Sequence, residues 1–228
     1  MATRCYRCFR PVDYCLCRYV DDIDAHIRFV FLMHPKEAKR NRTGTGRIAH
    51  SSLRDSELFV GLTFSGNERL LAVLTDERYF PVLLYPGDGA LTVRSPLIAA
   101  SSTHKQLLVI VIDATWFCAR KIIEHNPFLL TLPRLSFAGT YTSIFTFKRE
   151  PRPEYLSTIE SCYYLITEAR DSALIPQTVD AEPLMRVFKQ LITAQLQAEN
   201  DRIAGKRPDT HAYNWKYTRL RTIPRFDR

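Results

Sequence analysis

The chain has 228 residues, of which 46% are hydrophobic, and carries a formal net charge of +8. This length suits one globular domain with small attachments, or two small domains, and the apolar content suffices for a sizeable core. No apolar run approaches the ~18 residues that a membrane span needs, and the N-terminus lacks the apolar segment of a secretory signal. We therefore expect a cytoplasmic protein without a membrane partner.

Four of the six cysteines lie near the N-terminus, in the spacing C-x2-C-x6-C-x-C. Two close pairs of thiolates joined by a loop can supply the tetrahedral ligand set of zinc. Two disulfides are the alternative, which a reducing compartment disfavours. We predict a closed, structural zinc knuckle over residues 1–25, with four ligands: Cys5, Cys8, Cys15 and Cys17.

The pattern of apolar residues after this cluster predicts alternating strands and helices over residues 26–200. The predicted strands cover residues 26–33, 57–60, 79–85, 107–112, 129–137 and 145–147. The predicted helices cover residues 67–76, 95–105, 114–125, 157–170 and 182–200, and the basic stretch from residue 36 is expected to be helix or loop. Such alternation predicts an α/β fold with a mostly parallel sheet.

The segment 107–112 is the most informative part of the chain. Its six apolar residues, four of them β-branched, indicate a strand that is buried on both faces. Asp113 follows at the carboxyl end of this strand, the edge at which open α/β sheets bind ligands. Its carboxylate could act as a base or could cap the next helix. Trp116 could stack on a planar ligand or belong to the core.

The last 28 residues, 201–228, form a predicted basic tail. They contain eight Lys or Arg against three Asp, and aromatic residues are interleaved with the cations. Basic and aromatic side chains together suit an RNA backbone with unstacked bases. A solvated tail whose rings pack on the domain is the alternative.

Several motifs together, in their order and spacing, resemble the DTW-domain family. Its members are tRNA-uridine aminocarboxypropyltransferases related to the SPOUT-class methyltransferases. The motifs are the cysteine cluster, Met33-His-Pro-Lys-Glu37, Asn41-Arg-Thr-Gly-Thr-Gly-Arg47, Leu83-Leu-Tyr-Pro86, Asp113-Ala-Thr-Trp116, Leu132-Pro133 and Leu156-Ser-Thr-Ile-Glu160. The family usually carries an arginine shortly before a proline-containing turn, for which Lys148 and Arg149 are the candidates here.

The resemblance implies a SPOUT-like catalytic domain over residues 26–200, threaded as a trefoil knot between about residues 79 and 165. It also implies S-adenosylmethionine as co-substrate, and the sequence contains neither a G-x-G-x-x-G fingerprint nor a P-loop. The implied reaction transfers the 3-amino-3-carboxypropyl group to the ring imide nitrogen of a uridine in tRNA and releases 5′-methylthioadenosine. The rival interpretations are an RNA methyltransferase of the same fold and a non-catalytic, zinc-containing RNA-binding module. The oligomeric state is open, with a monomer favoured.

The resemblance and the strand ends together define a candidate site. Its catalytic candidates are Asp113, Thr115 and Trp116. Its cofactor-binding candidates are Leu84, Tyr85, Pro86, Gly87, Ile112, Asp113, Leu132, Pro133, Ser157, Thr158 and Glu160. The RNA-binding candidates are His34, Lys36, Arg40, Arg42, Arg47, Lys148, Arg149, Lys216, Arg219 and Arg221. Structural alternatives are a strand-ending turn at residues 85–87, a capping box at Ser157 and Glu160, and solvated charge for the arginines.

Overall fold

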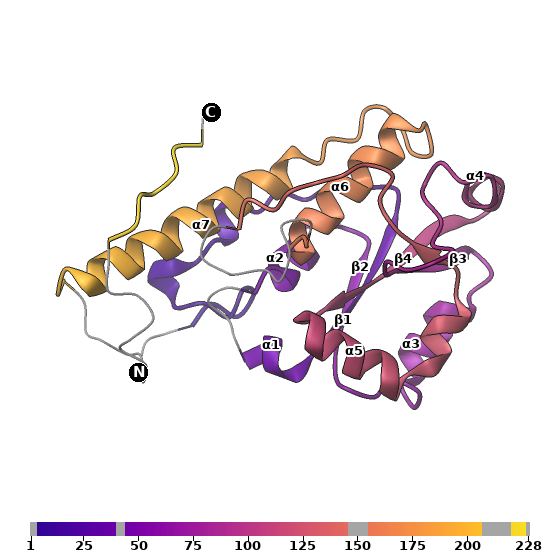
Figure 1. The fold of residues 1–228 in the computed structure, drawn as a ribbon, viewed down its shortest axis with the longest axis horizontal. Coiled ribbons are helices and arrows are strands. Elements are labelled where there is room, and N and C mark those ends of the chain that lie inside the picture. Colours follow the sequence, from indigo (N-terminus) through magenta and orange to yellow (C-terminus); the bar gives the residue numbers. More distant parts are fainter. Residues whose placement is uncertain (1–3, 40–43, 146–154, 207–219, 227–228) are drawn as a thin grey trace.

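A computed structural model describes residues 4–39, 44–145, 155–206 and 220–226. Within these residues, five parallel strands form one sheet in the order β2-β1-β4-β3-β5 (Figure 1). The strands are β1 (Arg28–Met33), β2 (Ser56–Val60), β3 (Tyr79–Leu84), β4 (Gln106–Asp113) and β5 (Arg134–Leu135). The predicted parallel α/β fold is confirmed, with β4 in the middle of the sheet.

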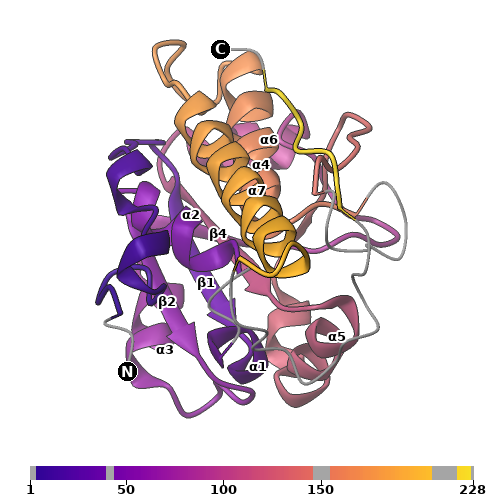
Figure 2. The ribbon, with the colours of Figure 1, turned by 90° about the vertical axis from the view of Figure 1, so that its left-hand side faces the viewer.

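Helices cover both faces of the sheet. One face carries α2 (Gly46–Ser52), α4 (Pro96–Ser102), α6 (Thr158–Asp171) and α7 (Glu182–Ile203). The other carries α3 (Glu68–Thr75), α5 (Trp116–His125) and the 3-10 turn η3 (Pro127–Thr131), while α1 (Pro35–Lys39) directly follows β1. Figures 1 and 2 show that α7 lies over α6 and α2 as an outer layer.

The side chains of β4 alternate between two buried clusters. Val109 and Val111 belong to the cluster under α6 and α7, whereas Leu108 and Ile110 belong to the cluster under α3 and α5. Because strand side chains alternate with a period of two, Asp113 points to the same face as Val109 and Val111. The last residue of the central strand is therefore a carboxylate directed towards α2 and α6.

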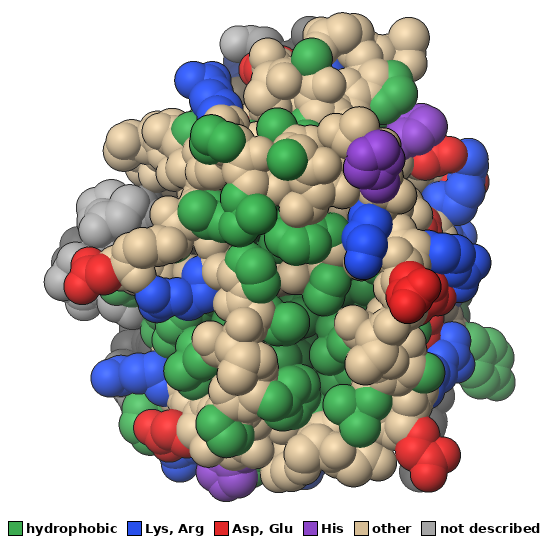
Figure 3. Space-filling model, turned by 90° about the vertical axis from the view of Figure 1, so that its right-hand side faces the viewer, with side chains coloured by type: hydrophobic (Ala, Val, Ile, Leu, Met, Phe, Trp, Pro, Cys, Tyr) green, Lys and Arg blue, Asp and Glu red, His purple; other side chains and the backbone are tan. Residues whose placement is uncertain are grey.

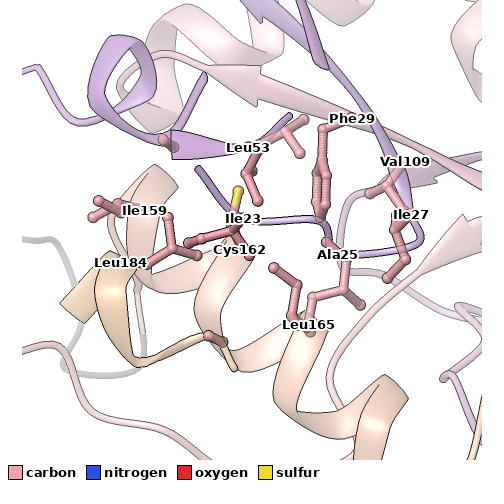
Figure 4. Close-up of a cluster of buried hydrophobic side chains, with 14 of the residues drawn as sticks. Ile23, Ala25, Ile27, Phe29, Leu53, Val109, Ile159, Cys162, Leu165 and Leu184 are labelled. Atoms are coloured by element: carbon pink, nitrogen blue, oxygen red, sulfur yellow. The ribbon is translucent and has the colours of Figure 1, made fainter. Parts of the chain in front are cut away.

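The segment that leads from the cysteine cluster into β1 is part of the core. Ile23 is buried between Leu53, the C-cap of α2, and Cys162 of α6 (Figure 4). Its N–H donates to the Ser52 carbonyl at 2.8 Å, and its carbonyl accepts from Arg54 N–H at 2.9 Å. Burial of this kind contributes roughly 25 cal/mol per Å² of apolar surface, so the N-terminal region is held by the same core as the sheet.

Two of the predicted strands differ from the structure. Residues 129–137 form the end of η3 and a strand of only two residues, because Pro133 has no N–H to donate and offers only its carbonyl, which accepts from Leu83 N–H. The predicted strand over residues 145–147 is wrong at Phe145, which lies in no strand, and its other residues lie outside the described part of the chain. The basic stretch from residue 36, which was expected to be helix or loop, leads into the short helix α2, which the sequence pattern does not predict as a separate element.

The predicted knot and SPOUT relationship stay predictions. The chain between residues 79 and 165 includes residues 146–154, which lie outside the described ranges. Among the described helices, none has both the length and the apolar composition of a membrane span.

Hydrophobic side chains also reach the surface. Figure 3 shows the side on which α4 lies, where they gather over the middle of the face while charged side chains lie mainly towards its margins. Leu97 of α4 is 51% exposed. More than half of the surface of an ordinary soluble protein is apolar, so this band does not by itself indicate a function.

Candidate functional site

A cavity of about 380 Å³ opens at the carboxyl ends of β3 and β4, between α5 and α6. Its volume lies in the range of about 300–1,000 Å³ that is typical of small-molecule sites. Six of the predicted site residues line it: Leu84, Tyr85, Pro86, Ile112, Trp116 and Thr158. The cavity therefore opens at the sheet edge where the sequence predicts a ligand site, and binding at these residues stays a prediction.

Aromatic rings form much of the cavity wall. Trp116 lies 4.3 Å from Tyr155 and 6.2 Å from Tyr85, measured between ring centroids. Tyr141, which also lines the cavity, stacks on Tyr164 at 3.8 Å. Such walls are suited to a flat heterocycle, since aromatic side chains bury large apolar areas and stack with specific geometry.

Glu168 of α6 holds the loop that carries Tyr141. Its buried carboxylate accepts hydrogen bonds from Ala138 N–H at 3.0 Å, Gly139 N–H at 2.8 Å and the Tyr141 hydroxyl at 2.8 Å. Burial, together with this hydrogen bond, raises the pKa of Tyr141. A Cβ atom at Gly139 would lie only 2.7 Å from the Tyr141 hydroxyl, so the loop needs a glycine there. The sequence interpretation missed Glu168, although a carboxylate on a buried helix face is a detectable signal.

Glu160 holds the next part of the same loop. It is fully buried, and it accepts from Ile144 N–H and the Ser143 hydroxyl, both at 2.8 Å. It also accepts from Ser157 N–H at 2.8 Å, which confirms the capping box at the start of α6. Because protein donors contact both of its oxygens, the structure gives Glu160 a positioning role, and contact with a ligand stays a prediction.

Replacing Glu168 with Gln should weaken this attachment. The carboxamide turns an NH2 group towards one of the loop donors, and an unsatisfied buried group costs about 1–3 kcal/mol. We therefore expect Glu168→Gln to lower the free energy of unfolding in urea by that amount. The exposed Glu124→Gln change on α5 is the matched control and should stay within about 0.5 kcal/mol of the unmodified protein. Equal stability of the two variants would contradict the proposed attachment.

Asp113 lies behind the cavity wall rather than among its lining residues. It is 4% exposed, and the Thr158 hydroxyl donates to its Oδ1 at 2.6 Å. Gly46, the first residue of α2, packs so closely that an added Cβ would lie 2.3 Å from Oδ2. The carboxylate thus lies against the first turns of α2 and α6. Its charge also partly offsets the burial that lowers the pKa of Arg47.

A residue other than Asp113 caps helix α5. Helix α5 begins at Trp116, and Thr115 is its N-cap, with Oγ1 accepting from Cys118 N–H at 3.4 Å. The alternative that Asp113 caps this helix is therefore wrong, because the chain extends for two more residues before the first turn. A catalytic role for Thr115 stays a prediction.

Other candidates lie close to the cavity without lining it. Gly87 has a φ of +147°, a backbone conformation that favours glycine and is typical of a turn. An added Cβ there would lie 2.5 Å from the Arg134 guanidinium. Leu132 and Pro133 precede β5, and the chain reaches the cavity only two to three residues later, at Leu135 and Ser136. Tyr141 and Tyr155 were missed because their segment shows no periodic pattern.

The four N-terminal cysteines form a second candidate site. Their Sγ atoms all lie within 4.8 Å of one another, with Cys5 and Cys17 3.7 Å apart and Cys8 and Cys15 3.8 Å apart. A tetrahedron with Zn–S bonds of about 2.3 Å has S···S edges of about 3.8 Å. The arrangement therefore fits a closed, four-thiolate zinc site, which would stabilise the fold and leave no position for catalysis.

The electrostatic surroundings of the thiols also suit a cation. The backbone N–H groups of Cys8 and Arg7 lower the pKa of Cys5 to about 6, which favours a thiolate. Burial raises the pKa of Cys15 and Cys17, a cost that a bound cation would offset.

The cysteine cluster packs against α2 and the residues before it. Arg7 donates to the Ser51 carbonyl at 2.7 Å, and the buried Arg10 donates to the Gly44 carbonyl at 3.5 Å. The Arg47 guanidinium lies 4.4 Å from the centre of the Phe9 ring, within cation–π range. The knuckle thus supports the helix whose first residue touches Asp113.

Zinc content tests the metal assignment. We expect about one zinc per chain by elemental analysis, and Cys8→Ser should lose the metal because a closed site needs four ligands. Its melting temperature should fall, since metal binding contributes to folding. Cys118→Ser is the control, because Cys118 lies in α5 and should leave the metal content unchanged. Metal-free protein whose four N-terminal cysteines are disulfide-bonded would support the rejected alternative.

The RNA-binding candidates divide into described and undescribed residues. His34 is buried, and its Nδ1 accepts from Lys36 N–H at 3.1 Å. Burial and then the Lys36 charge lower the pKa of His34, which favours the neutral ring. Lys36 is exposed, Arg47 is partly buried, and the backbone of Arg221 pairs with the Asn200 side chain. The other candidates, Arg40, Arg42, Lys148, Arg149, Lys216 and Arg219, lie outside the described residues.

The fold and its candidate sites define a parallel α/β protein with a ligand-sized cavity at the sheet edge and a four-cysteine cluster that could hold a metal ion. Residues 2–196 match the DTW domain, and the chain belongs to the DTW-domain family. It is 24% identical over 196 residues to tRNA-uridine aminocarboxypropyltransferase 2 of Macaca fascicularis, a match covering 85% of this chain and 63% of that protein. It is also 24% identical over 193 residues to the Drosophila melanogaster protein of the same name, covering 82% and 74%. The chain therefore spans less than two thirds of the first relative. No solved structure matches it.

Proposed function

We propose that this protein transfers the 3-amino-3-carboxypropyl group of S-adenosylmethionine to the ring imide nitrogen of a uridine in tRNA. The proposal rests on one observation above all: a chain of the DTW-domain family, whose relatives are named for this transfer, has a ligand-sized, aromatic cavity beside its Asp-x-Thr-Trp motif. The net charge of +8 is suited to a polyanionic substrate. We expect a cytoplasmic monomer.

The proposed reaction is a nucleophilic substitution at a sulfonium. The uridine imide nitrogen forms a bond to the terminal methylene of the aminocarboxypropyl group as the C–S bond breaks. The electron pair of that bond stays on sulfur in neutral 5′-methylthioadenosine, and the imide proton must leave. Positioning can supply about 7–11 kcal/mol of such a barrier, and it also decides which of the three carbon substituents on sulfur is transferred.

The cavity wall offers suitable contacts for this co-substrate. Rings such as Tyr85, Trp116 and Tyr155 can enclose the adenine, and backbone groups after β3 and in the loop held by Glu168 lie within the same wall. Contacts of this kind leave no glycine-rich motif in a sequence.

We propose that the imide proton reaches Asp113 through Thr158. Thr158 lines the cavity, and its hydroxyl donates to the Asp113 carboxylate at 2.6 Å. The hydroxyl oxygen can therefore accept the imide proton as its own proton passes to the carboxylate, which needs no direct contact between Asp113 and the base. General-base assistance contributes about 10²–10⁴ in rate.

Mass spectrometry tests the proposed reaction. The protein is incubated with S-adenosylmethionine and unmodified tRNA, and the digested nucleosides and the small-molecule product are identified. We expect aminocarboxypropyl-uridine together with 5′-methylthioadenosine. Methylated nucleoside with S-adenosylhomocysteine would instead establish an RNA methyltransferase. Retained RNA binding without binding of S-adenosylmethionine in calorimetry would favour a non-catalytic module.

Three substitutions test the proton path. Asp113→Asn keeps the shape of the side chain but cannot take a proton, and Thr158→Val removes the hydroxyl. Both should lower kcat by ~10²-fold or more while binding of S-adenosylmethionine is retained. Thr158→Ser keeps the hydroxyl and should keep most of the activity. Near-normal turnover of Asp113→Asn would leave Asp113 with a structural role only.

A further inference from the structure

The first turn of α5 carries an unusually exposed aromatic residue. Phe117 is 60% exposed, and it directly follows Trp116, which lines the cavity. Successive helix residues diverge by about 100°, so these two rings point in different directions from the same turn. A single exposed apolar side chain is common, so the significance of Phe117 depends on what surrounds it.

One cation contacts the exposed ring, and a second lies on the neighbouring helix α1. The Lys121 ammonium lies 4.8 Å from the centre of the Phe117 ring, one helical turn further on. Lys36 belongs to α1, which directly follows β1, and its N–H donates to His34 Nδ1 at 3.1 Å. Figures 1 and 2 show α1 and α5 side by side at this end of the sheet. Phe117 therefore lies on a basic rim next to the cavity.

We propose that Phe117, Lys121 and Lys36 bind an unpaired nucleotide adjacent to the target uridine. The Phe117 ring would stack on the base, and the two ammonium groups would contact its phosphates. Single-stranded nucleic acids are typically bound in this way, since every base has a face that can stack. A uridine placed in the cavity beside Trp116 would leave its neighbour unstacked and close to Phe117. The inference rests on the proposed function, because it takes RNA as the substrate.

Binding measurements with matched variants test this stacking site. Phe117→Leu keeps an apolar side chain without a ring, and Phe117→Trp keeps a ring. Fluorescence anisotropy with tRNA and with a single-stranded RNA oligonucleotide should show Kd raised roughly 5- to 100-fold for Phe117→Leu, and little changed for Phe117→Trp. Leu97→Ala, at a residue exposed by 51% on α4, is the control and should bind like the unmodified protein.

The salt dependence of RNA binding tests the proposed phosphate contacts. Lys121→Gln should weaken RNA binding and reduce the slope of log Kd against log salt by about 1, as expected for one lost phosphate contact. Melting temperatures and calorimetric binding of S-adenosylmethionine should be unchanged for all of these variants, because the side chains are exposed and lie outside the cavity lining.

The outcomes separate this inference from the proposed reaction. If Phe117→Leu binds RNA as tightly as the unmodified protein, the stacking site is overturned, even if 5′-methylthioadenosine is still produced. If RNA binding falls as expected while the unmodified protein forms no such product, the stacking site stands and the proposed reaction fails. Altered self-association in sedimentation, with RNA binding unchanged, would assign Phe117 to an interface between copies and overturn the proposal.

Discussion

The buried carboxylate of Asp113 is the interaction on which the arrangement of this protein depends. A buried charge is costly unless hydrogen bonds and dipoles satisfy it. Here the Thr158 hydroxyl donates to it, and the first turns of α2 and α6 converge on it, with Gly46 leaving just enough room. One side chain thus links the central strand to two helices, and β4 and α6 both contribute residues to the cavity lining.

Two further groups of polar contacts extend this frame. On one side, Glu160 and Glu168 of α6 hold the loop whose aromatic residues close the cavity. On the other side, the cysteine cluster packs on α2 through Arg7 and Phe9. A metal that orders the knuckle would therefore support α2, and through Gly46 would also support the surroundings of Asp113.

The cavity and its rim divide the proposed chemistry into two parts. Apolar rings inside the cavity can shield a sulfonium and select the carbon that faces the nucleophile, which is needed because the unhindered methyl group is otherwise the easiest to transfer. Outside, cations and the exposed Phe117 offer contacts that a phosphate backbone and an unstacked base require. The hydroxyl of Thr158 connects the cavity to the buried carboxylate of Asp113.

Local patterns were enough to predict the parallel sheet, most helix ends, the capping box at Ser157 and the cysteine cluster. These features depend on neighbours within a few residues, such as the run 107–112 or the pairs Cys5–Cys8 and Cys15–Cys17. Contacts between residues far apart in the chain could not be predicted. The tertiary structure alone brought Gly46 and Thr158 to Asp113 and attached the loop of Tyr141 to Glu168. The periodicity of apolar residues indicates which face of an element is buried. Tertiary packing decides which buried polar groups contact one another, and those contacts shape the site.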